Sequence, residues 1–354
     1  MRRGFITAGC WTIDRIKLID AWPDEDALSQ IATVERLGGG CAHSFGIDMK
    51  KLDPDMPVEA IGLLGQDPDG DFLRKRASDA GVDVTQLQQT PDASTPFTDV
   101  MTVETTGRRT FFYHPGSNDL LNPAHFNLAK TNGAVLHLGL LGLHKNMDAR
   151  WDDEQSGWVS VLKEAQALGI RTNVELVSIA AERIREIAWP CLPFLDSLIV
   201  NDHEIGGLTG CETLVNGKTD VDACIDAAKQ AMQAGSMSIV VVHYPEGAFA
   251  LERSGAFFQL PSFPVSQRDI KGAVGAGDAF AAGFLYALNE RQRIEDALRL
   301  AHATAAISLT VADAVGAIRT AEENLAFAKN LYSCLLYTSP SPRDQRGSRM
   351  PSSA

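Results

Sequence analysis

Apolar and polar side chains follow two patterns along the chain, and each predicts a different kind of element. Short, uninterrupted apolar runs are typical of strands buried on both faces, and four such runs occur at 60–65, 134–138, 197–200 and 238–242. Stretches with helical spacing of apolar residues lie between these runs, as at 71–80, 157–168 and 220–234. This alternation predicts an α/β fold with a doubly wound, mostly parallel sheet, in which ligands bind beyond the carboxyl ends of the strands.

A second pattern is strict alternation of apolar and polar residues, which is typical of strands with one face in water. It occurs at 11–19 and 98–104, and a Thr106-Gly107 turn then leads into a further run at 109–113. We expect a small antiparallel sheet whose strands lie roughly within 11–20, 32–40 and 96–114. From the residues alone, this sheet could be a lid over a ligand cleft or a surface hairpin without a catalytic part.

The C-terminal segment 333–354 differs from the rest of the chain. It is rich in Ser, Pro and Arg and has no apolar periodicity, so we expect it to be disordered. It also looks like translated vector or sequencing-adapter sequence, and we interpret it as non-native read-through. The folded domain is therefore expected to span 1–332.

Composition narrows the class of protein. The chain has 354 residues, is 45% hydrophobic and can bury a large core. Its formal net charge of -13 argues against a nucleic-acid partner, which requires a basic face. The sequence contains neither a signal-peptide core nor about 18 consecutive apolar residues, so we expect a cytoplasmic protein without a membrane partner. The six cysteines form no Cys-x-x-Cys pair, which leaves no support for a zinc site or a disulfide framework.

The segment 272–280 combines glycines with an acid and runs directly into a small-residue apolar stretch. It predicts a glycine-rich turn that opens a helix, with Asp278 in the first helical turn. Free amides at such a helix start can hold phosphate oxygens, and the helix dipole keeps the nearby carboxylate ionised. The same residues could also be a tight loop whose acid merely begins a helix.

The string Gly-Ala-Gly-Asp-Ala-Phe, followed by Ala-Gly near the C-terminal end, resembles the signature of the ribokinase-like (PfkB) carbohydrate kinases. The resemblance extends over residues 4–330 and implies a three-layer α/β fold with a small β lid. It implies that Asp278 is the catalytic base and that the backbone amides of Gly275, Ala276 and Gly277 hold the transferred phosphate.

The substrate side of the site follows from an early glycine motif. Residues 38–43 stand where this family carries Gly-Gly-x-x-x-Asn, a segment that meets the sugar hydroxyls, and His43 replaces the asparagine. We expect Gly39, His43 and Asp14 to bind substrate, since an imidazole or a carboxylate can bond hydroxyls in pairs. The alternative for His43 is a histidine that merely starts a helix. The later turn at 65–70 matches a family motif whose acids we expect to cap the next helix.

The nucleotide side rests on four positions. Asn201 and Glu204 match the family's Asn-x-x-Glu motif, which implies that Glu204 holds Mg²⁺ indirectly, through water. The alternative is a capping Asn with a solvated Glu. Asn173 ends another expected strand and could line the same cleft, and Gly247 is the one glycine retained from a family loop beside the nucleotide.

The sequence therefore predicts an ATP- and Mg²⁺-dependent kinase that phosphorylates a hydroxyl of a small sugar or sugar-like polyol. Gly272-Ala273 replace the family's Asp-Thr, which relatives associate with a monovalent-cation site, so K⁺ activation is not assumed. Two alternatives remain open: a nucleoside kinase of the same fold, and a catalytically silent sugar-binding regulatory protein. Relatives often dimerise through the lid, but nothing in the sequence fixes the oligomeric state.

Overall fold

The computed structural model describes residues 2–272 and 274–338, and its centre is a nine-stranded sheet. The strands, in spatial order, are β15 (Phe257–Pro261), β14 (Gly247–Glu252), β13 (Ile239–Tyr244), β10 (Ser197–Asn201), β9 (Arg171–Leu176), β8 (Val135–Leu141), β1 (Phe5–Gly9), β4 (Val58–Gly65) and β5 (Asp83–Thr90). Pairing is parallel from β13 to β5, and the pairs β13–β14 and β14–β15 are antiparallel. The four apolar runs of the sequence are β4, β8, β10 and β13, which confirms the expected sheet.

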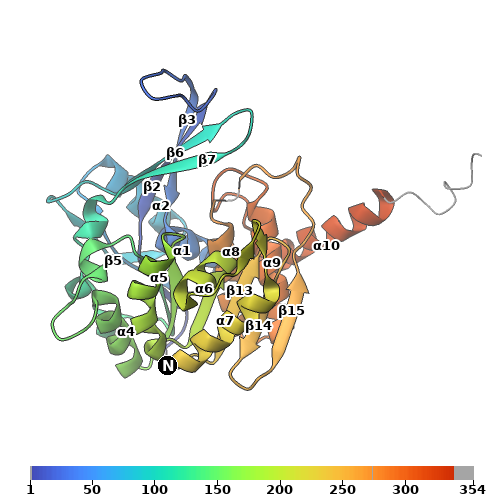
Figure 1. Cartoon of the computed structure of the whole chain (residues 1–354). Helices are drawn as coiled ribbons and strands as arrows, with labels where there is room; N and C mark the ends of the chain where they lie inside the picture. Colours follow the sequence, from blue (N-terminus) through green and yellow to red (C-terminus); the bar gives the residue numbers. More distant parts are fainter. Residues whose placement is uncertain (1, 273, 339–354) are drawn as a thin grey trace, which may run out of the picture.

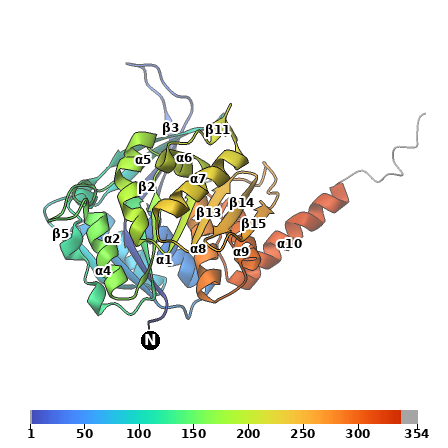
Figure 2. The same cartoon turned by 60° about the horizontal axis from the view of Figure 1, so that its bottom comes forward.

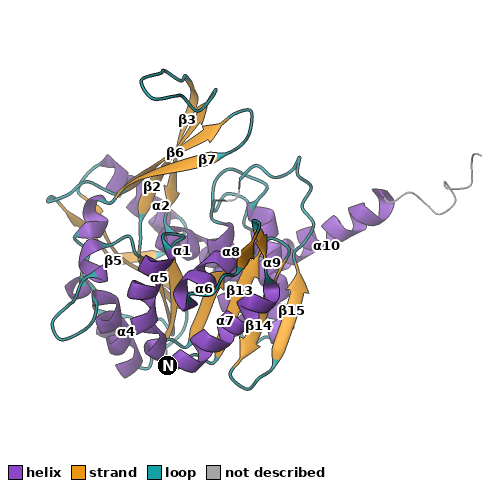
Figure 3. Cartoon of the chain, viewed as in Figure 1, coloured by secondary structure: helices purple, strands orange, loops and turns teal. Residues whose placement is uncertain are grey.

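Helices cover both faces of this sheet, as Figure 3 shows. One face packs against α4 (Gly157–Ala167), α5 (Ala181–Ala188), α6 (Asp202–Thr209) and α7 (Val221–Ala234). The other packs against α1 (Cys41–Leu52), α2 (Pro68–Asp79), α8 (Ala276–Asn289) and α9 (Ile294–Ser308). Each layer has its own hydrophobic core, because the parallel strands are apolar on both sides. A short helix α3 (Lys145–Asp148) and a ribbon of β11 (Leu214–Val215) and β12 (Lys218–Thr219) complete the body.

The predicted acid cap at 65–70 is confirmed. The Asp67 side chain accepts hydrogen bonds from the amides of Asp69 and Gly70 and begins α2. Its carboxylate also binds the amide and the hydroxyl of Thr95, at 2.7 Å each, and thereby ties the helix to the segment that leads into the lid. This motif therefore has a structural use.

A second, four-stranded sheet projects from the body beyond one end of the large sheet (Figure 1). Its strands lie in the order β3 (Ile31–Gly39), β2 (Thr12–Ile19), β6 (Phe97–Val103) and β7 (Arg109–His114). β2–β3 and β6–β7 are antiparallel hairpins, and the parallel pairing of β2 with β6 joins them. We call this sheet the lid. Its strands lie within the three segments expected from sequence, except that β3 begins one residue before 32.

The last described helix is α10 (Ala321–Thr338), which extends away from the body in Figure 2. It takes in the beginning of the segment 333–354 for which the sequence predicts disorder, so the helix continues past the expected end of the folded domain. Residues 339–354 lie outside the described part of the chain, and the domain boundary stays a prediction. No described helix is both long enough and apolar enough to cross a bilayer.

Candidate functional site

The glycine-rich segment forms the predicted turn and opens α8. Gly275 is the N-cap residue with φ of 79°, and a Cβ at this position would lie 2.5 Å from the Ala314 Cβ, so only glycine fits without rearrangement. No side chain among the described residues caps this helix. The first amides of α8 are therefore available to an anion, and the helix dipole favours negative charge there.

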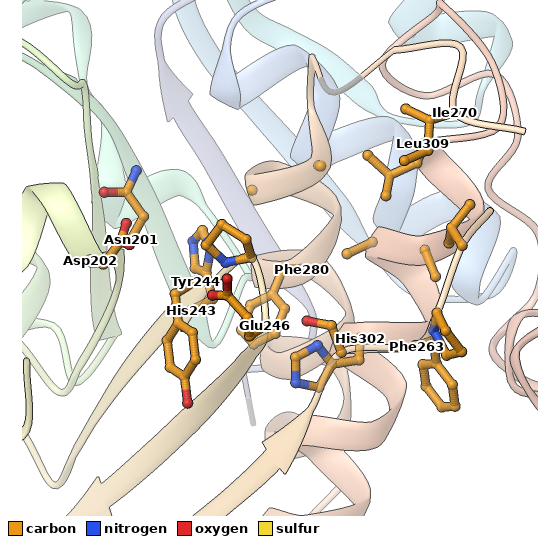
Figure 4. Close-up of a pocket in the computed structure, with 18 of the residues that line it drawn as sticks. Asn201, Asp202, His243, Tyr244, Glu246, Phe263, Ile270, Phe280, His302 and Leu309 are labelled. Carbon is orange, nitrogen blue, oxygen red and sulfur yellow. The ribbon is translucent and has the colours of Figure 1, made fainter. Parts of the chain in front are cut away.

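A cavity of about 790 Å³ lies at the carboxyl ends of β10 and β13, within the usual range for a ligand pocket. Ala276, Gly277 and Phe280 of α8 form part of its wall. Figure 4 shows the cavity between polar and apolar sides, with Asn201 and Asp202 at one end and Ile270 and Leu309 at the other. His243 and His302 flank the Phe280 ring, with ring centroids 4.9 and 5.3 Å away.

Asp278 leaves α8 on the side away from this cavity, and it lies among other acids. Its pKa is raised well above the usual value, first by burial and then by the neighbouring Glu175 carboxylate. The carboxyl groups of Asp278 and Glu175 are hydrogen-bonded to each other. Burial also raises the pKa of Glu175, to about 7. Two acids in contact thus stand at the start of α8.

Glu175 is held by a chain of buried polar groups. His137 Nε2 lies 2.7 Å from Glu175 Oε2, and His137 Nδ1 lies 3.0 Å from Asn173 Nδ2. Asn173 also donates to the Val174 carbonyl and accepts from the Ser197 hydroxyl. Asn173 was expected to line the cleft, but its side chain is fully buried and its bonding capacity is used within this chain of contacts. The structure therefore places it behind the carboxyl pair.

Asp14 and Gly39 meet on the lid side of Asp278. Asp14 is 8% exposed, and its pKa is raised to about 7 by burial and then by the nearby Asp278. Gly39 lies so close that a Cβ there would approach Asp14 Oδ2 to 2.2 Å. Two of the three residues expected to touch substrate are therefore next to each other and near Asp278.

His43 has different surroundings from those expected. It is fully buried, packs edge-on against Trp11 with ring centroids 5.9 Å apart, and lies against Gly38. Burial lowers its pKa to about 3, so it is neutral. Neither ring nitrogen has a hydrogen-bond partner among the described residues. A substrate could reach His43 only after rearrangement of the surrounding core.

Asn201 and Glu204 form a capping box at the start of α6. Asn201 Oδ1 accepts from the Glu204 amide, and Glu204 Oε2 accepts from the Asn201 amide, at 2.8 and 3.0 Å. The Ser178 hydroxyl donates to Glu204 Oε1 at 3.4 Å, and burial raises the pKa of Glu204 to about 7. Both oxygens are engaged, so this pair fits Mg²⁺ through bound water rather than by direct ligation. Within residues 2–272 and 274–338, no three His, Cys, Asp or Glu side chains gather as a metal site.

The first turn of α8 thus borders both halves of the site. Ala276 and Gly277 line the large cavity together with Asn201, while Asp278 lies near enough to Asp14 to raise its pKa. Gly247 lies next to the cavity, at the start of β14, beyond the lining residues Tyr244, Pro245 and Glu246.

Sequence reasoning missed Glu175 and His137. A histidine within the otherwise apolar run of β8, and an acid two positions after Asn173 in β9, were the available signals.

Comparison with known proteins gives a consistent result. The model of the pfkB family carbohydrate kinases matches residues 10–321. The chain is 25% identical over 321 residues to an ATP-dependent ribose-1-phosphate kinase from Halopiger xanaduensis, covering 88% of this chain and 96% of that protein. It resembles the structure of Arabidopsis thaliana ribokinase complexed with ribose and ATP, with a TM-score of 0.76, 21% identity and coverage of 93% and 99%. A putative ribokinase II from E. coli in complex with ATP and Mg²⁺ gives a TM-score of 0.74, 18% identity and coverage of 93% and 99%.

Proposed function

Because the chain belongs to the pfkB family of carbohydrate kinases, we propose that it transfers the terminal phosphoryl group of ATP to a hydroxyl of a small sugar or sugar-like polyol. One observation carries the proposal. The first turn of α8 has free amides beside a nucleotide-sized cavity on one side and an acid beside a second group of polar residues on the other. Phosphoryl transfer needs an anion hole between a donor and an acceptor site.

ATP would occupy the cavity between β10, β13 and α9, close to Gly247. The solved relatives with bound ATP support this choice, since they share the fold over nearly the whole chain. The amides of Gly275, Ala276 and Gly277 would hold the phosphoryl oxygens. Since charge is spread over these oxygens in the transition state, fixed amide dipoles at a helix start are suited to stabilise it.

Mg²⁺ would be held through water by Glu204, with Asn201 orienting the carboxylate. When bound, the ion neutralises charge on the nucleotide oxygens. Burial raises the pKa of Glu204, and a bound cation would lower it again, because a nearby positive charge favours the ionised carboxylate. Gly272 offers no carboxylate for a monovalent cation, so K⁺ activation is not assumed.

The acceptor sugar would lie between the lid and Asp278. Asp14 would bind its hydroxyls, and the backbone of Gly39 permits close approach. Asp278 would orient the reacting hydroxyl and take its proton as the phosphoryl group arrives. His43 shapes this wall through Trp11 and Gly38 rather than touching the sugar.

We further propose that the chain forms a homodimer through the lid. Six large apolar side chains are exposed on or beside the lid strands: Trp22, Leu28, Ile31, Val34, Phe111 and Phe112. The rings of Trp22 and Phe112 are stacked with centroids 6.1 Å apart and form a flat apolar surface. An exposed patch of this kind is typical of a protein interface.

The experiment that tests the activity is an ATP-consumption screen over free sugars, polyols, sugar phosphates and nucleosides, each with and without K⁺. Turnover with a sugar or polyol supports the proposal. Turnover with nucleosides alone would favour a nucleoside kinase. Tight ligand binding without turnover on any compound would favour a silent binding protein and contradict the proposal.

A further inference from the structure

We propose that Glu175 is a positioning residue for the phosphoryl-transfer reaction: it shares one proton with Asp278, and a fixed chain through His137, Asn173 and Ser197 orients it. The inference rests on the proposed function, because it assigns Asp278 the role of base. It concerns groups that lie outside the lining of the large cavity.

The hydrogen bonds fix the direction of this chain. The Ser197 hydroxyl donates to Asn173 Oδ1 at 3.1 Å, and Asn173 Nδ2 donates to the Val174 carbonyl at 3.2 Å, so the orientation of the amide is determined. The same Nδ2 then donates to His137 Nδ1 at 3.0 Å. His137 must therefore carry its proton on Nε2 and donate it to Glu175 Oε2 at 2.7 Å.

The imidazole has little freedom to depart from this arrangement. His137 is fully buried, and its ring stacks on Phe45 with centroids 4.0 Å apart. Burial lowers its pKa to about 4, so the ring is neutral at physiological pH. Glu175 thus receives a hydrogen bond without a full positive charge. The acceptor oxygen is fixed, and the rest of the carboxyl group is left to face Asp278.

Two carboxyl groups in contact and largely shielded from water do not both ionise readily, since the second charge is strongly opposed by the first. The pair therefore holds one proton and one negative charge. The raised pKa of both groups agrees with this arrangement. It leaves a carboxylate oxygen of Asp278 for the substrate, while Glu175 fixes the plane of the group from behind.

The proton count of the transfer step then balances. The O–H bond of the substrate breaks as its oxygen forms a bond to phosphorus, and the bond from phosphorus to the leaving nucleoside diphosphate breaks. Asp278 takes the substrate proton, and the shared proton moves fully to Glu175. The pair ends with two protons and no charge, and one proton returns to water after product release.

Other titratable groups face the pair from every neighbouring element. Those that act on Asp278 or on Glu175 are Asp14 of β2, Cys41 and Asp48 of α1, Glu204 of α6, His137 of β8 and Cys10 after β1. None of these six groups is hydrogen-bonded to Asp278, whereas Glu175 is. It is therefore the group whose replacement should move the titration of Asp278 most.

The test compares the wild type with Glu175→Gln by carboxyl ¹³C NMR of selectively labelled protein. The Asp278 resonance is identified by its loss in Asp278→Asn. A glutamine keeps the acceptor for His137 but presents an amide donor to Asp278, so the Asp278 titration should move to lower pH by about one unit or more. The acid limb of the kcat/KM profile should move in the same direction. The control is Glu164→Gln, on the exposed side of α4. This variant should move neither the Asp278 titration nor the acid limb of the kcat/KM profile.

An unmoved Asp278 titration in Glu175→Gln would overturn the inference. This readout needs no substrate, so a chain without kinase activity but with the expected shift would contradict only the proposed function. If the variant does not fold, the ¹⁵N spectrum of wild-type His137 decides. We expect a protonated Nε2 and an unprotonated Nδ1, and the opposite tautomer would overturn the chain of contacts.

Discussion

Gly39 lies against the carboxylate of Asp14, so closely that a Cβ on residue 39 would come within 2.2 Å of Asp14 Oδ2. The two residues sit on the paired strands β3 and β2, which connect the lid with the body. The position of the Asp14 carboxylate thus depends on the absence of a side chain at Gly39. This relation gives the glycine of the early motif a physical role, which is to leave room for the acid.

Replacing this glycine should damage substrate binding first. In Gly39→Ala the Asp14 carboxylate has to move, and a hydrogen bond from a sugar hydroxyl to a charged group contributes about 1.5–3 kcal/mol. We expect KM for the accepted sugar to rise roughly tenfold or more, with a smaller change in the KM for ATP. Steady-state kinetics in both substrates measures this, with thermal unfolding to verify the fold. An equal rise in KM for the sugar and for ATP would argue against a local effect on Asp14.

The raised pKa of Asp14 predicts a pH dependence of stability. The group has a pKa of about 7 in the folded chain and 3.8 ordinarily, so the folded state binds more protons between these values. Its favourable contribution is complete below pH 3.8 and is lost as pH rises towards 7. Asp14→Asn should therefore gain stability relative to the wild type over this window, by the order of 2–4 kcal/mol. Urea unfolding across this range measures the difference. A difference that stays constant with pH would show that Asp14 is not perturbed.

The lid surface predicts the oligomeric state. Introducing a charge in Phe112→Glu should disrupt an interface built on Phe112, Phe111 and Trp22, and should convert a dimer into a monomer. Light scattering coupled to size-exclusion chromatography measures the mass. The matched control is Val215→Glu, an exposed apolar residue on β11, far from the lid in sequence. A monomeric wild type, or a dimer that survives in Phe112→Glu, would contradict the lid interface.

The sequence alone predicted the parallel sheet well, because strands that are buried on both faces consist of uninterrupted apolar runs. β4, β8, β10 and β13 all lie where such runs were read. The lid strands were predicted from the alternation of apolar and polar residues. The parallel pairing of β2 with β6 was not predicted, because a local sequence pattern does not show which distant strands pair. The turn at Gly275 and the cap at Asp67 followed from local chemistry.

The site was predictable only in part. Asp278, Asp14 and Gly39 come together in space, whereas His43 and Asn173 are buried with their side chains directed at protein groups. A motif position tells which strand or helix end a residue occupies, but not how its side chain is packed. The His43 ring lies against Trp11 without a hydrogen bond among the described residues, and the hydrogen bonds of Asn173 are made within the protein. Glu175 and His137 were missed because their contact with each other depends on the register of β8 against β9, which the sequence does not show.

The central claim is that Asp278 is the base in transfer from ATP to a hydroxyl, and Asp278→Asn tests it most directly. An amide cannot take the proton, so kcat should fall by about 10²–10⁴-fold, while the Kd for ATP measured by calorimetry should change little, since Asp278 lies outside the cavity wall. The control is Asp296→Asn at the partly exposed start of α9, which should keep normal turnover. A kcat for Asp278→Asn close to that of the wild type would contradict the account.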